Sequence, residues 1–399
     1  MKSVQNFLVT LLFAAVSLLA FGQSAPRISL LTAEPGPEIY ELYGHEGVRV
    51  ISPDGNDIVY NFGLFDFNEP NFIYRFVKGE TDYMGGVVPT PVFLSSYAER
   101  GSKVTEQVLN LTPSEALKMD SLLRNAVLPA NASYRYKYCT NNCATRVVDI
   151  LEQSVASPPL YPSLEPAPGS YRDVMRRYDS NYPWYILGVD MALGNGIDSA
   201  IGTRQRMFVP LELHDIAAST RLADGRPLVK SENVLVQGQG DRRLGPTPFL
   251  LSPIFWAWLL LFASLLIVYN AMRRGWNVWR WWVSAWFFLT GIVGCLSWFL
   301  IFISVHEATS PNILGWWLNP LWLIPAFSLW MPGARRFTRV FLCGLSLASA
   351  AMLLAWCFGA QQSSYSLMLF CVTTLVLSLS YALTGASTHR RHRHHHVKK

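Results

Sequence analysis

The side chains that could act as a nucleophile and its base are few in the first 249 residues. They are two cysteines and two histidines: Cys139, Cys143, His45 and His214. Apolar residues recur at helical spacing from Cys143 onward, so we expect a helix that begins at Cys143 and is capped by Asn141 or Asn142. The unpaired N–H groups and the dipole of a helix start favour a thiolate, which predicts a lowered pKa and a nucleophilic Cys143.

His45 is the candidate general base, because it opens a predicted strand and can meet in space a cysteine that is distant in sequence. A third polar group should orient its imidazole. The neighbouring strand offers Tyr60 and Asn61, and we favour Asn61 because it completes the cysteine–histidine–asparagine arrangement of papain-like enzymes. Two other interpretations remain open. His45 could be purely structural, or Cys139 and Cys143 could form a disulfide in an oxidising compartment, which would leave no free thiol to act as the nucleophile.

The elements that must position these residues are predicted from local patterns. Strand character is found in three segments, the last two joined as a hairpin by a turn-rich linker: residues 28–32, 46–51 and 58–62. Thr112-Pro113-Ser114-Glu115 predicts a capped helix that runs to about Ala126. The alternating stretch Tyr134–Tyr138 predicts a short strand just before the cysteines.

Charge and hydropathy divide the chain at residue 250. Of the 399 residues, 51% are hydrophobic and 15% are charged, whereas soluble domains average about 25% charged residues. The net charge of +6 combines +10 from residue 250 onward with −4 before it, and all tryptophans except Trp184 also follow residue 250. No basic stripe is present for a phosphate backbone to follow, which argues against a nucleic-acid partner. The sequence therefore predicts an exported domain followed by a membrane domain.

Five segments beyond residue 250 are long and apolar enough to span a bilayer, although Pro320 and Pro325 weaken the third. They are residues 250–269, 281–304, 313–331, 340–359 and 365–384. Five passes place two arginine clusters and the basic tail on the cytoplasmic side, and removing any one pass would move at least one cluster outside. The clusters are Arg273, Arg274 and Arg280, and Arg335, Arg336 and Arg339.

Four parts of the chain follow from these patterns. They are a signal peptide over residues 1–23, a periplasmic domain over 24–249, a transmembrane domain of five helices over 250–388, and a basic, histidine-rich cytoplasmic tail over 389–399. The alternative for the first part is an uncleaved anchor, although its apolar run is short for a bilayer. The tail could bind a metal, but we expect a solvated basic segment at the lipid surface and no metal site.

Several motifs give the exported domain a resemblance to a known family. They include Leu30-Leu31-Thr32, Tyr43-Gly44-His45, Val59-Tyr60-Asn61-Phe62-Gly63, Gln107-Val108-Leu109-Asn110-Leu111-Thr112 and Asn142-Cys143-Ala144-Thr145-Arg146. Together they resemble the Lnb N-terminal periplasmic domain family, and the spans that follow are similar to the membrane part of Lnb from Bacteroides-type bacteria. The order of histidine before cysteine also resembles permuted papain-like acyltransferases of the lecithin:retinol acyltransferase type. The resemblance implies an α+β, permuted papain-like periplasmic domain followed by an all-α bundle of five spans.

What the resemblance implies about activity is lipoprotein N-acylation in the bacterial inner membrane, without a cofactor. A fatty acid would pass from a membrane phospholipid, through a thioester on Cys143, to the α-amine of the lipidated N-terminal cysteine of a bacterial lipoprotein. His45 would activate first the thiol and then the amine.

Three further residues are expected to bind the oxyanion or the substrate: Asn142, Arg146 and Arg49. The two arginines would contact a phosphate headgroup. For Arg146 the alternative is a salt bridge on the helix surface with Asp149 or Glu152.

Two other functional classes remain open from the sequence. A membrane-tethered cysteine peptidase or amidase acting on cell-wall peptides would use the same dyad, but a single span would suffice to tether it. A non-catalytic envelope module, such as a sensor or assembly factor, would leave Cys143 packed or disulfide-bonded. A membrane domain that keeps the site close to lipid favours the acyltransferase.

Overall fold

The computed structural model describes residues 25–65, 70–163, 169–240 and 243–385. The predicted signal peptide and basic tail lie outside these residues. The chain folds into two compact units. The sheet unit comprises Met1–Phe65, Asp82–Ser163 and Met207–Arg242, and the membrane unit comprises Asp66–Thr81, Leu164–Arg206 and Arg243–Lys399. The units therefore interleave along the chain, whereas the sequence placed a single boundary between residues 249 and 250.

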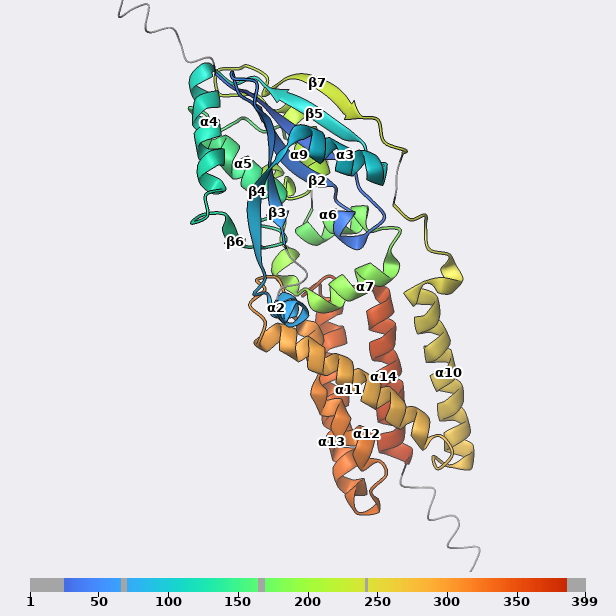
Figure 1. Cartoon of the computed structure of the whole chain (residues 1–399). Helices are drawn as coiled ribbons and strands as arrows, with labels where there is room; N and C mark the ends of the chain where they lie inside the picture. The colour runs from blue at the N-terminus through green and yellow to red at the C-terminus, as the bar shows by residue number, and fades with distance from the viewer. Residues whose placement is uncertain (1–24, 66–69, 164–168, 241–242, 386–399) are drawn as a thin grey trace, which may run out of the picture. The chain divides into compact units, whose positions relative to one another are not determined.

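The sheet unit is built on an antiparallel sheet, which has seven strands among the described residues, in the order β6-β4-β3-β2-β1-β5-β7 (Figure 1). The strands are β1 (Arg27–Ala33), β2 (His45–Ile51), β3 (Asp57–Leu64), β4 (Asp82–Pro89), β5 (Val104–Leu109), β6 (Ser133–Arg135) and β7 (Val229–Val236). The three predicted strands correspond to β1, β2 and β3, and the predicted hairpin between β2 and β3 is confirmed.

The register of this hairpin decides which side chains can meet His45. Gly47 pairs with Asn61, and Val48 pairs with Tyr60. Successive side chains of a strand point to opposite faces, so Asn61 shares a face with His45 and Tyr60 points to the other face.

Helices cover both faces of the sheet. On one face, Phe93 of α3 (Thr90–Arg100) packs against Leu31, Ala33, Val59 and Val104. The other face carries α4 (Pro113–Ala126), α5 (Cys143–Ser154) and α9 (Pro210–Ser219), with α5 packed on β2 and β3. The strands β1, β2 and β5 are largely buried, whereas most side chains of the edge strand β7 are exposed.

The two predicted helices of the sheet unit are confirmed. Thr112 caps α4 in a capping box with Glu115, and the second helix begins at Cys143 as expected. The predicted strand over 134–138 is wrong in its second half. β6 ends at Arg135, and the chain then turns back on itself through a bridge between Lys137 and Asn141.

Among the described residues of the membrane unit, four helices are long and apolar enough to cross a membrane, with mean hydropathies between 2.0 and 2.1. These helices are α10 (Pro253–Arg274), α11 (Arg280–Phe302), α13 (Arg335–Cys357) and α14 (Tyr365–Thr384). The prediction of five spanning helices is not confirmed. Residues 313–331 form two 3-10 turns and the short helix α12 (Leu323–Ser328), because Pro320 and Pro325 interrupt regular helical hydrogen bonding.

The broken segment nevertheless follows α11 from one end to the other in the antiparallel direction. Near one end of α11, the Nε1 of Trp298 donates to the carbonyl of Gly315 at 3.0 Å. In the middle, Gly294 lies directly against the backbone of Asn319. Near the other end, the Oγ of Ser284 donates to the carbonyl of Ala326.

Asn319 explains how a broken segment is tolerated among apolar helices. Its side chain is buried, its Oδ1 accepts from the N–H of Leu321 at 3.1 Å, and its Nδ2 donates to the carbonyl of Trp316 at 2.9 Å. Backbone groups that lack helical partners are thereby satisfied within the protein, as an apolar environment requires.

The membrane unit also contains four short helices: α2 (Phe72–Lys78), α6 (Tyr171–Tyr178), α7 (Pro183–Ala192) and α8 (Thr203–Arg206). Leu187 and Met191 of α7 pack against the core of the long helices. The 164–206 segment therefore belongs structurally with the spanning helices, although it precedes them by more than forty residues.

A buried arginine holds this segment together. Arg172 is fully buried, and it donates to Asp190 at 2.9 Å, to Asp198 at 2.6 Å and to the carbonyls of Leu193 and Gly194. Asp198 in turn accepts from the backbone N–H of Gln362, in the loop between α13 and α14, at 2.8 Å. One guanidinium thus connects α6 and α7 to a loop of the helical bundle.

We predict that Arg172→Leu destabilises the protein by about 3–5 kcal/mol, since it leaves buried acceptors without a cation or a donor. The measurement is the thermal unfolding midpoint of the full chain in detergent. Arg177→Leu, an exposed position on the same helix, is the matched control. Equal midpoints for the two variants would contradict this role of Arg172.

Candidate active site

Asn142 fixes the start of α5, the helix that carries Cys143 at its first position. Its Oδ1 accepts from the backbone N–H groups of Ala144 and Thr145, both at 2.9 Å. Its Nδ2 donates to the carbonyls of Tyr138 and Phe208 at 2.9 and 2.8 Å. The amide therefore both caps the helix and ties it to two other segments of the sheet unit.

All these side-chain groups have partners within the chain, so binding of an oxyanion or substrate by Asn142 stays a prediction. Even its backbone N–H donates to the Oγ1 of Thr145 at 2.7 Å. The residue is 5% exposed. Its contribution is to position Cys143.

Cys143 is half-buried, and its side chain lies beside the start of the neighbouring strand β2. Backbone N–H groups face its sulfur, from Glu46 on β2 and from Cys143 and Ala144 on α5. Its Cβ is also close to Gly63 on β3, at 3.9 Å from the position that a Cβ on this glycine would take. Cys143 and Cys139 are not joined by a disulfide, and Cys139 is buried.

His45 and Asn61 meet across the hairpin. The His45 Nε2 and the Asn61 Oδ1 are 2.6 Å apart. Because a carbonyl oxygen only accepts, this contact places the imidazole proton on Nε2 and leaves Nδ1 as the basic nitrogen. Tyr60 is 1% exposed on the opposite face, near Asp120 and Arg124, so it does not orient His45.

The structure thus brings His45 together with Asn61, and Cys143 together with the backbone of Glu46, the residue next to His45. A small cavity of about 90 Å³ lies beside the imidazole and is also lined by Tyr97 and Arg100. The other histidine, His214, lies instead beside the carboxylates of Asp215 and Glu232.

Burial keeps the thiol and the imidazole neutral. It raises the pKa of the Cys143 thiol, and the three N–H groups that face the sulfur offset this only in part. Burial also lowers the pKa of His45, against the opposing effect of the Asn61 hydrogen bond. The expected lowering of the Cys143 pKa is therefore wrong, because desolvation outweighs the helix start. A neutral imidazole and a neutral thiol are the protonation states from which general-base activation starts.

Glu46 is a site residue that the sequence analysis missed. Its side chain is fully buried, its Oε2 accepts from the Oγ1 of Thr32 at 2.8 Å, and its Oε1 has no hydrogen-bond partner among the described residues. Its pKa is raised to about 8, mainly by burial, and the nearby Cys143 contributes to the rise. The alternation Glu46, Val48, Val50 was the available signal, since it places a carboxyl on the buried face of β2.

Arg146 lies one turn after Cys143 on α5. Its guanidinium stacks 4.0 Å from the ring centre of Tyr134 and 5.4 Å from that of Phe62. Its Nη1 lies 3.4 Å from Asn141, and its Nε has no hydrogen-bond partner within the described part of the chain. Contact with a phosphate stays a prediction for this residue.

Arg49 does not fit the predicted headgroup contact. Its Nε and Nη2 donate to Asp57 at 2.9 and 2.6 Å, and its Nη1 donates to Glu106 at 2.9 Å. Its side chain is 14% exposed. Two carboxylates already neutralise this arginine, so its role is to hold β2, β3 and β5 together rather than to bind substrate.

No group of three or more histidine, cysteine, aspartate or glutamate side chains that could hold a metal ion was found in the described ranges. The groups described at this site are the thiol, the imidazole, the buried carboxyl and backbone N–H groups.

We predict that Glu46→Gln flattens the pH dependence of stability. An unfolded glutamate titrates near 4.5 and the folded Glu46 near 8, so the folded state binds more protons between these values. The free energy of unfolding of the wild type therefore falls as pH rises through this window. The unfolding midpoint of Glu46→Gln should fall less between pH 5 and pH 8, whereas Glu99→Gln, at an exposed position on α3, should follow the wild type. Parallel curves for all three proteins would contradict a buried, protonated Glu46.

Comparison with protein-family models gives two matches that account for most of the chain. The model of the Lnb N-terminal periplasmic domain matches residues 20–177, and the model of the Lnb transmembrane domain matches residues 246–388. Neither the curated proteins nor the solved structures that were compared include a match. The first model covers His45, Asn61 and Cys143, and the second covers all four spanning helices. With both models in this order, the chain belongs to the Lnb family.

Proposed function

We propose that this protein is a lipoprotein N-acyltransferase with Cys143 as its nucleophile. The observation that carries the proposal is the 2.6 Å contact between His45 and Asn61. His45 begins β2, and the N–H group of the next residue, Glu46, faces the Cys143 sulfur. An oriented imidazole beside a cysteine at a helix start is the arrangement of a thiol acyl-transfer site. The strand that carries the histidine precedes the helix that carries the cysteine, and this order supports a permuted papain-like architecture.

In the first half-reaction the acyl donor is an ester of a membrane phospholipid. The Nδ1 of His45 takes the proton of the Cys143 thiol as the sulfur attacks the ester carbonyl. Collapse of the tetrahedral intermediate breaks the bond to the glycerol oxygen, which receives the proton from His45 and leaves as lysophospholipid. The products are this lipid and a Cys143 thioester.

In the second half-reaction the acceptor is the α-amine of a lipidated N-terminal cysteine of a bacterial lipoprotein. The amine attacks the thioester, His45 takes a proton from the amine, and the sulfur leaves and regains a proton. The product is an amide, and the enzyme returns to its starting state.

Two groups at the site support the charge that develops in both steps. The backbone N–H groups of Glu46 and Cys143 face the sulfur and are the donors that favour its negative form. Asn142 is not among the proposed donors, since its Nδ2 donates to the carbonyls of Tyr138 and Phe208. A protonated Glu46 also avoids a second negative charge beside the thiolate.

The membrane topology follows from the path of residues 312–331. Because this segment runs antiparallel to α11 along its whole length, we propose that it is a fifth, irregular crossing of the membrane. Five crossings return the arginine clusters near Arg274 and Arg336 to one side, the cytoplasm, by the positive-inside rule. The sheet unit and Cys143 then face the periplasm, and the tail is cytoplasmic.

The two competing functions are weaker. A cell-wall peptidase or amidase would use the same dyad but does not account for the membrane unit. A non-catalytic module with a Cys139–Cys143 disulfide loses support, because the two cysteines are not bonded to each other.

We predict that Cys143→Ala abolishes N-acylation. The full chain is reconstituted in phospholipid vesicles with a lipidated lipoprotein peptide, and the acyl chains of the product are counted by mass spectrometry. Cys139→Ala, four residues away and also in the sheet unit, is the matched control and should retain activity. A Cys143→Ala protein that still adds the acyl chain would contradict the proposal, as would release of peptide fragments in place of acyl transfer.

We also predict that Asn61 sets the pH profile of the reaction. Its hydrogen bond raises the pKa of His45, so Asn61→Ala should lower this pKa and move the acidic limb of the kcat/KM profile to lower pH, with a rate loss of about tenfold or more. Asn61→Asp adds a negative charge beside the ring and should move the same limb to higher pH. A uniform loss of rate with no movement of either limb would indicate a merely structural asparagine.

A further inference from the structure

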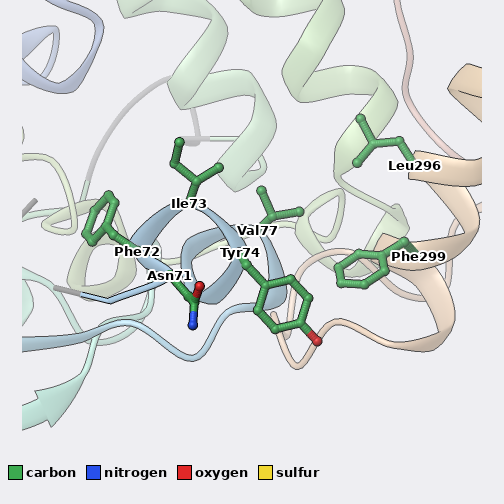
Figure 2. A pocket seen from close by; sticks show the side chains of 7 residues that line it. All are labelled: Asn71, Phe72, Ile73, Tyr74, Val77, Leu296 and Phe299. Atoms are coloured by element: carbon green, nitrogen blue, oxygen red, sulfur yellow. The ribbon is translucent and has the colours of Figure 1, made fainter. Parts of the chain in front are cut away.

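An apolar groove lies within the membrane unit, between α2 and α11. It has a volume of about 670 Å³ and is lined by Asn71, Phe72, Ile73, Tyr74, Val77, Leu296 and Phe299. Figure 2 shows the ring of Tyr74 on α2 turned toward that of Phe299 on α11, and their ring centres are 6.2 Å apart. The volume lies in the range of pockets that bind small molecules, and all but one of the lining residues are apolar or aromatic.

The contacts around α2 hold this groove in a defined shape. The Nε2 of His306, just beyond α11, lies 2.8 Å from the carbonyl of Phe76. The N–H of Val305 donates to the carbonyl of Lys78 at 2.8 Å. Gly79 also lies so close to His306 that a Cβ there would meet its backbone nitrogen at 2.9 Å. α2 is therefore fastened to the end of a spanning helix.

The exposed surface of α2 is unusual for a helix in water. Ile73, Tyr74 and Phe76 are 77%, 54% and 49% exposed, and no residue of α2 is buried. Exposed apolar area of this kind is costly in water and is stabilised at a lipid interface. The basic side chains Arg75 and Lys78 on the same helix match the headgroup level of a membrane.

The other wall of the groove belongs to α11, one of the helices long and apolar enough to cross a membrane. α11 has a mean hydropathy of 2.0, and little of its surface is buried within the protein. Leu296, in the groove, is 45% exposed. The groove is thus lined on this side by an apolar helix that is long enough to cross a membrane.

We propose that the groove between α2 and α11 binds an acyl chain of a membrane phospholipid, with the headgroup on the side of Arg75 and Lys78. The occupant is a lipid chain rather than a peptide, because the lining offers almost no hydrogen-bonding groups to a peptide backbone. Asn71 is the single lining residue with an amide side chain.

The assignment of this phospholipid as the acyl donor rests on the proposed function. Along the chain, β3, which carries Gly63 beside the Cys143 Cβ, is the element that precedes α2.

Photolabelling tests the groove independently of catalysis. The full chain with Cys143→Ala is placed in phospholipid nanodiscs that contain a phosphatidylethanolamine with a diazirine on one acyl chain. After irradiation, adducts are mapped by mass spectrometry. We expect adducts on residues 71–78 that exceed those on the exposed face of α10, and a loss of at least fivefold in Leu296→Trp, which fills the groove.

Leu289→Trp is the matched control, since Leu289 is 61% exposed two turns away on the same helix but outside the groove. It should leave the labelling unchanged. Ile73→Asp, which places a charge at an exposed position that lines the groove, should also reduce labelling. Labelling of α2 that is no stronger than that of α10, or that is equal in Leu296→Trp and Leu289→Trp, would overturn the proposal.

A second arm separates the groove from the reaction. With Cys143 intact, Leu296→Trp should lower kcat/KM for the phospholipid about tenfold, whereas Leu289→Trp should not. If labelling follows the prediction but none of the proteins with Cys143 intact transfers an acyl chain, binding of an acyl chain in the groove is supported and the proposed function is contradicted. If labelling is lost in Leu296→Trp while acyl transfer is unchanged, the groove is not the donor site.

Discussion

The geometry of the candidate active site depends on one buried amide. The side chain of Asn142 makes four hydrogen bonds, two that start α5 and two that tie this helix start to the carbonyls of Tyr138 and Phe208. Cys143 is the next residue, so the position of its sulfur follows from that cap. Without the cap, the unpaired N–H groups of the first turn would need other partners, and the sulfur would lose its fixed distance from β2.

The second constraint is the register of the hairpin between β2 and β3. Pairing of Gly47 with Asn61 places the amide within hydrogen-bonding distance of His45, and a slip of one residue would turn Asn61 to the opposite face. The ion pairs of Arg49 with Asp57 and Glu106 hold three strands in this register. Arg49, which the sequence suggested as a substrate ligand, therefore contributes to the site by holding these strands in register.

Much of this arrangement could be predicted from local patterns. The start of α5 and the strands of His45 and Asn61 were predictable, because capping residues and alternation act over a few residues. Three features were not. The pKa of Cys143 depends on burial by distant segments, the partners of Arg49 come from distant strands, and the irregular path of residues 313–331 depends on Asn319 and on packing against Gly294. The division into units was also hidden, since 66–81 and 164–206 join the membrane unit through contacts with residues far along the chain.

The central claim is that Cys143 carries the acyl chain, and the intermediate itself is the most direct test. The full chain is incubated with phospholipid but without a lipoprotein acceptor, and its intact mass is then measured before and after hydroxylamine. The account predicts a mass increase of one acyl chain that maps to the peptide containing Cys143 and disappears with hydroxylamine. An unchanged mass, or an adduct that maps to Cys139 or resists hydroxylamine, would contradict it.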